Sequence, residues 1–133
     1  ETSGGGAGRV NSVLARYKPG FLLILYGAND LLHGRDQAAT IDNLRYMIQA
    51  AKNNKTIPVI STLTPMTGNY HLWDTGEQRL SNAIRALANE EGAWLVDAAA
   101  EFDHDAGYMS IDGLHPNDAG CQLLALAFYD EVN

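Results

Sequence analysis

The segment that most constrains the fold is residues 21–26, which have the sequence FLLILY and glycine on both sides. An unbroken apolar run of this length is typical of a strand that is covered on both faces of a sheet, because none of its side chains needs to meet water. It is far shorter than the roughly 18 residues expected of a membrane span. We therefore predict that residues 21–26 form a central strand of a parallel sheet.

Apolar side chains at helical spacing occur before and after this run in the sequence. A first helix is predicted through residues 10–17, and Pro19-Gly20 ends it. A second helix is predicted through residues 41–51, ended by Asn53-Asn54, with a strand over residues 57–63 after it.

The rest of the chain repeats this alternation. Thr75 and Gln78 form a capping box that opens a third helix, which ends at Glu91-Gly92. Residues 94–96 are a short third strand, and Pro116 is predicted at the first position of the last helix.

The order α-β-α-β-α-β-α predicts a three-layer α/β/α sandwich with a parallel sheet, as a single domain over residues 1–133. A doubly wound unit normally opens with a strand, whereas this chain opens on a crossover helix. If residues 21–26 lay at the sheet edge, an apolar strand would expose its unpaired backbone. We therefore expect the domain to be incomplete at its N-terminus, with a further strand beside residues 21–26.

The composition excludes several classes of function. Apolar residues make up 46% and charged residues 19% of the chain, which suits a folded domain. The net charge is -7 without a cluster of Lys and Arg, so we expect no nucleic-acid partner. Cys121 is the only cysteine, which excludes an intrachain disulfide. We predict a soluble protein with no membrane span and no cofactor. The compartment stays open, with secretion or the periplasm among the options.

Gly27-Ala28-Asn29-Asp30 comes directly after the first strand, where open α/β sheets place their ligands. The Asn29 amide could donate to a developing oxyanion, and Gly27 would allow a sharp turn. The alternative is an ordinary strand-ending turn in which Asn or Asp caps the next element.

Asp112-Gly113-Leu114-His115-Pro116 precedes the last helix and is also expected at the carboxyl end of the sheet. A carboxylate three residues before a histidine can fold back on the ring when a glycine allows a tight turn. The acid would then fix the tautomer and leave the other ring nitrogen as a general base. The alternative is an Asp-Gly turn that leads into a proline-started helix.

Together, the two motifs resemble the GxND and DxxHP blocks of the SGNH hydrolases, also called the GDSL family, and the resemblance spans essentially the whole chain. It implies a flavodoxin-like fold and an ester hydrolase acting on small-molecule esters. In that comparison Asn29 is an oxyanion-hole side chain, His115 the general base and later acid, and Asp112 the carboxylate that orients it.

Two blocks of that family have no counterpart in these residues. The family's nucleophilic serine stands in a Gly-Asp-Ser block after the first strand, and its oxyanion-hole glycine is usually followed by an acidic residue and Thr or Ser. Glu1-Thr2-Ser3 resembles that continuation. The resemblance therefore implies an N-terminal segment that carries the serine, as the expected extra strand also indicates, and this segment is the predicted partner of the chain.

The serines within the chain are poor substitutes for that nucleophile. Ser110, in the loop before Asp112, is the least implausible of them. The others lie in predicted helices, in a strand or in the glycine-rich opening: Ser3, Ser12, Ser61 and Ser81. Residues 3–8 lack the lysine of a P-loop and the third glycine of GxGxxG, so we interpret them as the entrance to the first helix.

Two further segments have polar or aromatic candidates. Asp103-His104-Asp105 could chelate a metal, but adjacent loop residues rarely supply more than two usable ligands, so we predict no metal site. Residues 65–75 should overhang the same rim of the sheet, where Trp73 either shapes the pocket or fastens the loop. Gly27, Trp73 and Leu114 are the candidate substrate-binding residues.

Three functional hypotheses follow. The first is a serine esterase whose nucleophile lies on the N-terminal segment, so that this chain alone is inactive. The second is a non-catalytic binding module on the same fold. The third is a metal-dependent hydrolase that uses Asp103, His104 and Asp105.

Overall fold

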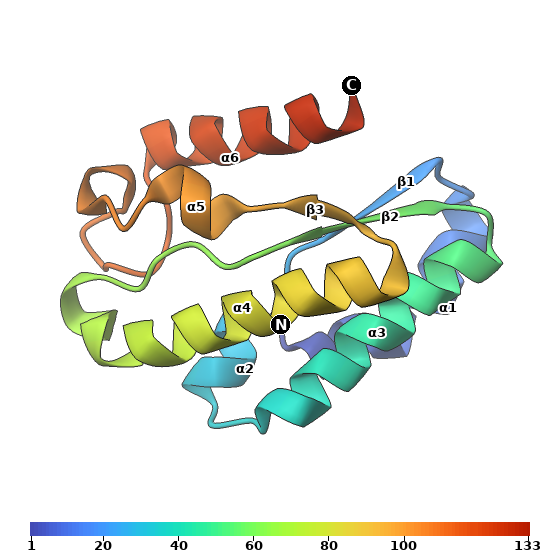
Figure 1. Cartoon of the computed structure of the whole chain (residues 1–133), viewed down its shortest axis with the longest axis horizontal. Coiled ribbons are helices and arrows are strands. Elements are labelled where there is room, and N and C mark those ends of the chain that lie inside the picture. The colour runs from blue at the N-terminus through green and yellow to red at the C-terminus, as the bar shows by residue number, and fades with distance from the viewer.

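Three short parallel strands form the middle layer of the protein, as shown by a computed structural model that describes all 133 residues (Figure 1). They are β1 (Phe21–Ile24), β2 (Ile57–Ser61) and β3 (Trp94–Val96), and β2 lies between the other two. In the register, Phe21 faces Ile57 and Val59 faces Trp94. The predicted parallel sheet is confirmed.

Helices cover both faces of this sheet, with α1, α3 and α4 on one side and α6 on the other (Figure 1). The long helices are α1 (Ser3–Tyr17), α3 (Gln37–Asn53), α4 (Asp74–Glu91) and α6 (Asp118–Val132). The short elements are the helices α2 (Ala28–Leu32) and α5 (Ala98–Phe102) and the 3₁₀ helices η1 (Gly68–Trp73) and η2 (Ala106–Tyr108). The three-layer α/β/α sandwich is therefore confirmed, and no helix combines the length and hydrophobicity needed to cross a membrane.

The main hydrophobic core lies between the sheet and helices α1, α3 and α4. Its members are apolar side chains at helical spacing together with the inward residues of β1 and β2, such as Leu14, Ile24, Leu44, Ile60 and Ile84. No residue of α6 belongs to this cluster, and Gly120 is the only buried residue of that helix. The layer formed by α6 is therefore thinly packed.

Strand β1 is an edge strand, with β2 as its only partner. Its expected position in the middle of the sheet is therefore not seen within these residues. Burial alternates along it, and the Leu23 side chain is 54% exposed. Leu23 also lines an apolar groove with α6, whose side chains there include Leu124, Phe128 and Tyr129. One edge of the sheet thus presents apolar side chains and unpaired backbone.

The first helix begins earlier than predicted, at Ser3, so the glycine-rich residues are helical rather than an entrance. Packing explains this, because a Cβ at Gly6 would lie 2.7 Å from the Tyr26 ring and 3.0 Å from the Met47 sulfur. The absence of a side chain lets α1 approach β1 and α3 closely. This tertiary contact overrides the low helix propensity of glycine.

Two predicted helix starts are wrong. Helix α4 begins at Asp74 directly after η1, so Thr75 is not a cap, and Gln78 bonds the Asp74 carboxylate instead. Helix α6 begins at Asp118, where the Asn117 side chain accepts from the Gly120 N–H. Pro116 lies before that cap and forms an isolated bridge with Met109.

The first two predicted strands are too long at their carboxyl ends, whereas the third has the predicted bounds. β1 ends at Ile24 and β2 at Ser61, and the apolar residues that follow belong to loops.

Candidate active site

A cleft of about 280 Å³ opens at the carboxyl edge of the sheet. It brings together the segments that follow β1 and β2 and the loop before α6, which are far apart in the sequence. Its lining residues are Glu1, Leu25, Tyr26, Gly27, Ala28, Asn29, Leu63, Thr64, Leu114, His115 and Pro116. The two motifs singled out in the sequence therefore meet at one site.

The Asp112 carboxylate and the His115 ring form a close pair. His115 Nδ1 lies 2.6 Å from Asp112 Oδ2, and the Leu114 and His115 backbone N–H groups donate to Asp112 Oδ1 at 2.8 and 3.0 Å. The hydrogen bond from the His115 ring, then those from the two N–H groups and the Ser110 hydroxyl, hold the Asp112 pKa well below its usual range. With Asp112 ionised, Nδ1 is the protonated ring nitrogen and Nε2 is available as a base.

Gly113 gives this loop its shape. Its φ is +78°, and a Cβ there would lie 2.2 Å from the Thr67 carbonyl oxygen. Thr67 in turn donates to the Gly113 carbonyl from its backbone N–H at 2.8 Å and from its hydroxyl at 3.1 Å. The loop after β2 thus holds the loop that carries His115.

Asn29 lies in the first turn of α2 and also faces the cleft. Its side-chain amide donates to the Glu1 carbonyl at 3.1 Å. Because an amide group has two N–H donors, one remains for another acceptor. Gly27 has φ +131°, and a Cβ would lie 2.9 Å from Leu80, so this sharp turn needs glycine.

Asp30 is an anchoring residue whose role the sequence did not reveal. It is buried, and its carboxylate accepts from the Ser3 N–H at 2.8 Å, from the Ser3 hydroxyl and from Thr40. These bonds tie α2 to the start of α1 and so hold Asn29 beside Glu1. The only signal in the sequence was an acidic residue next to Asn29 at a strand end.

Other predicted candidates lie elsewhere. Trp73 does not line the cleft; it ends η1, where its ring packs against Tyr70 at 5.8 Å between centroids. The Ser110 hydroxyl lies 2.9 Å from Asp112 Oδ1 and 2.6 Å from the His115 carbonyl oxygen and donates to one or the other of them, not to the imidazole. The remaining serine hydroxyls bond inside helices, in β2 or at Asp30: Ser3, Ser12, Ser61 and Ser81. No serine of the chain contacts the His115 ring by a hydrogen bond.

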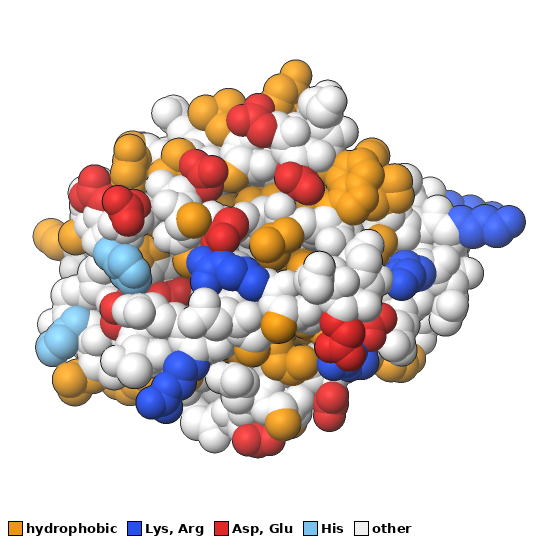
Figure 2. Space-filling model, viewed as in Figure 1, with side chains coloured by type: hydrophobic (Ala, Val, Ile, Leu, Met, Phe, Trp, Pro, Cys, Tyr) orange, Lys and Arg blue, Asp and Glu red, His pale blue; other side chains and the backbone are white.

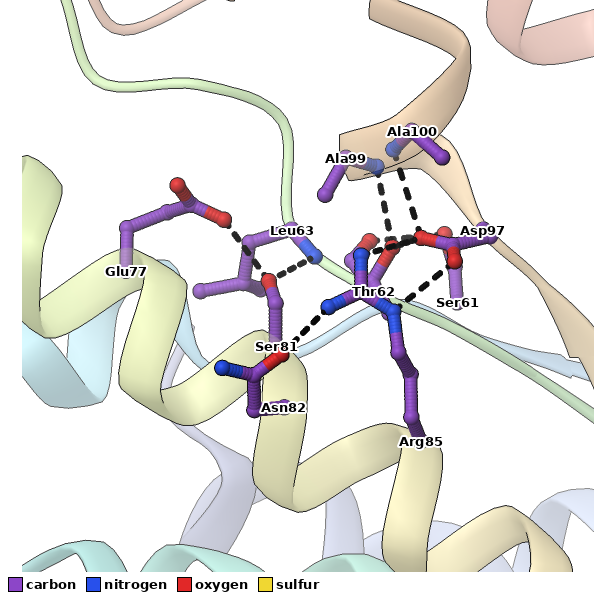
Figure 3. A network of polar contacts seen from close by, with 10 residues as sticks. All are labelled: Ser61, Thr62, Leu63, Glu77, Ser81, Asn82, Arg85, Asp97, Ala99 and Ala100. Atoms are coloured by element: carbon purple, nitrogen blue, oxygen red, sulfur yellow. Dashed lines mark hydrogen bonds and ion pairs between the residues drawn. The ribbon is translucent and has the colours of Figure 1, made fainter. Parts of the chain in front are cut away.

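A second polar network lies where β2 and β3 end and α4 passes (Figure 3). The Arg85 guanidinium donates to both oxygens of Asp97 at 2.8 Å, and the Thr62 hydroxyl donates to Asp97 at 2.9 Å. Asp97 also caps α5 by accepting from the Ala100 N–H. The network ties α4, β2 and α5 together, and the Arg85 bonds lower the Asp97 pKa.

Glu77 lies at the other end of this network and is almost fully buried. One carboxylate oxygen accepts from the Ser81 hydroxyl at 2.7 Å, and Ser81 accepts from the Leu63 N–H. Burial raises the pKa of the Glu77 carboxyl to about 7. A charged residue at this depth was not expected from the polar stretch around position 77.

Comparisons with known proteins identify a matching family and similar proteins. The profile of the GDSL-like Lipase/Acylhydrolase family matches residues 1–123. Esterase TesA of Pseudomonas aeruginosa is 32% identical over 119 residues, which are 87% of this chain and 57% of that protein. The chain therefore spans little more than half the length of this relative.

Solved structures show the same fold. A crystal structure of TesA superposes with a TM-score of 0.82 at 29% identity, over 100% of this chain and 73% of the other. A GDSL-like lipase from Bacteroides thetaiotaomicron gives a TM-score of 0.87 at 19% identity, over 98% of this chain and 70% of the other.

Replacing Gly113 by alanine should destabilise the protein much more than the same change at Gly34. Both glycines have positive φ, but a Cβ at Gly34 meets open space. We expect Gly34→Ala to cost about 1 kcal/mol for the left-handed backbone and Gly113→Ala about 2–4 kcal/mol, because the Thr67 backbone must also shift. Urea unfolding of the two variants measures this difference, and equal losses would contradict it.

The Asp112 carboxylate should remain ionised at pH about 3, where ordinary aspartates with a pKa near 3.9 are mostly protonated. Because its pKa is lower in the folded state, its stabilising contribution is present above the unfolded-state pKa and is lost as the pH falls. Carboxyl ¹³C NMR follows the titration directly.

The donors of Asp112 provide the controls for that titration. His115→Ala should raise the Asp112 pKa more than Ser110→Ala, since the ring bond is the larger cause. An ordinary Asp112 midpoint in the parent protein would contradict the hydrogen bonding described here.

Proposed function

The chain belongs to the GDSL-like lipase/acylhydrolase family, and from that premise we propose that it supplies the acid–base part of a serine esterase acting on small-molecule esters. The observation that carries this proposal is the meeting of the Asp112–His115 pair and Asn29 at one cleft. The His115 ring is 74% exposed, and its Nε2 makes no hydrogen bond within the chain. This nitrogen is therefore free to take a proton from a hydroxyl group.

In the proposed reaction, a serine Oγ attacks the ester carbonyl while His115 Nε2 takes its proton. Asp112 stabilises the imidazolium that forms. The free N–H of Asn29 donates to the oxyanion. His115 then gives the proton to the departing alcohol. Water, deprotonated by the same nitrogen, releases the acid and frees the serine.

We propose that this serine lies on a further segment of the polypeptide, outside the 133 residues. Every serine described above is bonded elsewhere, and the chain spans 57% of the length of esterase TesA. The free edge of β1 and the apolar groove at Leu23 are a suitable surface for an added strand and helix.

Substitution of the site residues should lower turnover without unfolding the protein that carries the serine segment. Asn29→Ala should lower kcat roughly a hundredfold or more, because one oxyanion donor is lost. Asp112→Asn should lower it roughly ten-thousandfold, because the His115 tautomer is no longer fixed. Hydrolysis of a short p-nitrophenyl ester measures both.

The matched control for these variants is His71→Ala, which removes an exposed imidazole bonded only to the Gly68 carbonyl. It should leave kcat unchanged. Unchanged kcat in Asn29→Ala would contradict the oxyanion role. Unchanged kcat in Asp112→Asn would contradict the dyad, and absence of any esterase activity in the serine-containing protein would favour a binding module.

The 133 residues alone should hydrolyse the same ester no faster than their His115→Ala variant, and should gain activity when the serine segment is added. Leu23→Asp should prevent that gain, because it places a charge on the edge where the segment docks. Leu72→Asp is the control, since Leu72 is 78% exposed on η1, outside the groove. Robust turnover by the isolated 133 residues would overturn the proposed origin of the nucleophile.

A further inference from the structure

Three metal-ligating side chains meet on the side of the protein formed by α4 and α5. Asp74 and Glu77 lie in the first turn of α4, and His104 lies in the loop between α5 and η2. One ligand atom from each lies within 4.8 Å of the other two. His104 Nδ1 is 3.8 Å from Asp74 Oδ1. None of the three lines the esterase cleft.

Two carboxylate oxygens at this cluster have no hydrogen-bond partner. Glu77 is 1% exposed, and its Oε2 is buried without a donor, as is Asp74 Oδ1. The other Glu77 oxygen accepts from the Ser81 hydroxyl at 2.7 Å, and the other Asp74 oxygen accepts from the Gln78 amide at 2.8 Å. In Figure 3 the second Glu77 oxygen points away from Ser81. Buried polar atoms are rarely left unsatisfied, so this pair of oxygens calls for a ligand.

The charges around this cluster favour a cation, and a crevice gives the cation access from solvent. A crevice of about 200 Å³ reaches Glu77 and is also lined by Asp103 and His104. Residues 86–133 contain neither Lys nor Arg, and the charged side chains seen over α5 and α6 are acidic (Figure 2). Arg85 also lines this crevice, but its charge is paired with that of Asp97 through two hydrogen bonds. The local field is therefore negative.

We propose that Asp74, Glu77 and His104 bind a divalent first-row transition-metal ion, for which Zn²⁺ is the best-matched probe. One imidazole nitrogen with carboxylate oxygens is a usual Zn²⁺ donor set, whereas Ca²⁺ prefers oxygen ligands alone. Tetrahedral ligands about 2.0–2.2 Å from Zn²⁺ lie roughly 3.3–3.6 Å apart, so the 3.8 Å pair needs only a small adjustment. Such an ion would link the loop between α5 and η2 to the first turn of α4.

This cluster differs from the sequence-based metal hypothesis, which grouped His104 with its neighbours. Asp103 and Asp105 are not members of it, and Asp105 instead accepts from the Gly107 N–H. The ligands on α4 precede His104 by a whole strand and helix, so only the fold brings them together.

Calorimetric titration of the purified protein with Zn²⁺ tests the proposal. We expect one Zn²⁺ per chain, a thermal midpoint that rises with Zn²⁺ and not with Ca²⁺, and visible d–d bands when Co²⁺ is substituted. Glu77→Gln and His104→Asn should each weaken Zn²⁺ binding at least about tenfold. His104→Asn keeps the fold, because the residue is exposed and asparagine tolerates its φ of 56°.

The matched control is Asp103→Asn, which removes a negative charge from the same crevice without removing a ligand. It should retain the parent affinity within a few-fold. The proposal is overturned if the parent protein does not bind Zn²⁺, if Ca²⁺ stabilises it equally, or if His104→Asn binds Zn²⁺ as tightly as the parent.

Discussion

The pairing of β2 with a parallel neighbour on each side is the constraint on which the rest of the protein depends. Val59 and Ile60 of β2 are completely buried, so a shift of register by one residue would place the wrong side chains in the core. Since all three strands run in the same direction, the segments that leave them share one edge. The cleft at that edge follows from this packing.

Most residues that line the cleft are partly buried, although His115 is exposed, and neighbouring residues hold them in place. Asp30 fixes the turn that carries Asn29, through bonds to Ser3 and Thr40. Thr67 fixes the Asp112 loop by its two bonds to the Gly113 carbonyl. A site whose side chains face solvent can keep its geometry because the ordering is supplied by this second layer of contacts.

The sequence was sufficient for the features that depend on local chemistry. Short runs of mainly apolar residues predicted all three strands, and the glycine in each motif predicted the turns at Gly27 and Gly113. Both positions have positive φ, which is a local backbone requirement, and a glycine in the sequence indicates it directly.

Features that arise from long-range contacts were missed. The Thr75 capping box has a correct local pattern, but η1 runs straight into α4 and leaves no free helix end to cap. Glu77 lies in a polar stretch that suggests an exposed helix face, yet the fold buries it. Helix α1 extends through glycines because Gly6 packs on Tyr26. In each case the deciding partner is distant in the sequence, so local propensity could not identify it.

The free edge of β1 links stability to the proposed chemistry. A strand that precedes a crossover helix and joins the same sheet runs parallel to the strand that follows, almost always with a right-handed connection. A strand paired with β1 would cover Leu23 and the unpaired backbone of this edge, and a helix on the α6 side of the sheet would cover the apolar side chains of α6. Its carboxyl end would then lie at the same edge as Gly27 and His115. The contact that best removes the exposed apolar surface is therefore also the one that would deliver a serine to the cleft.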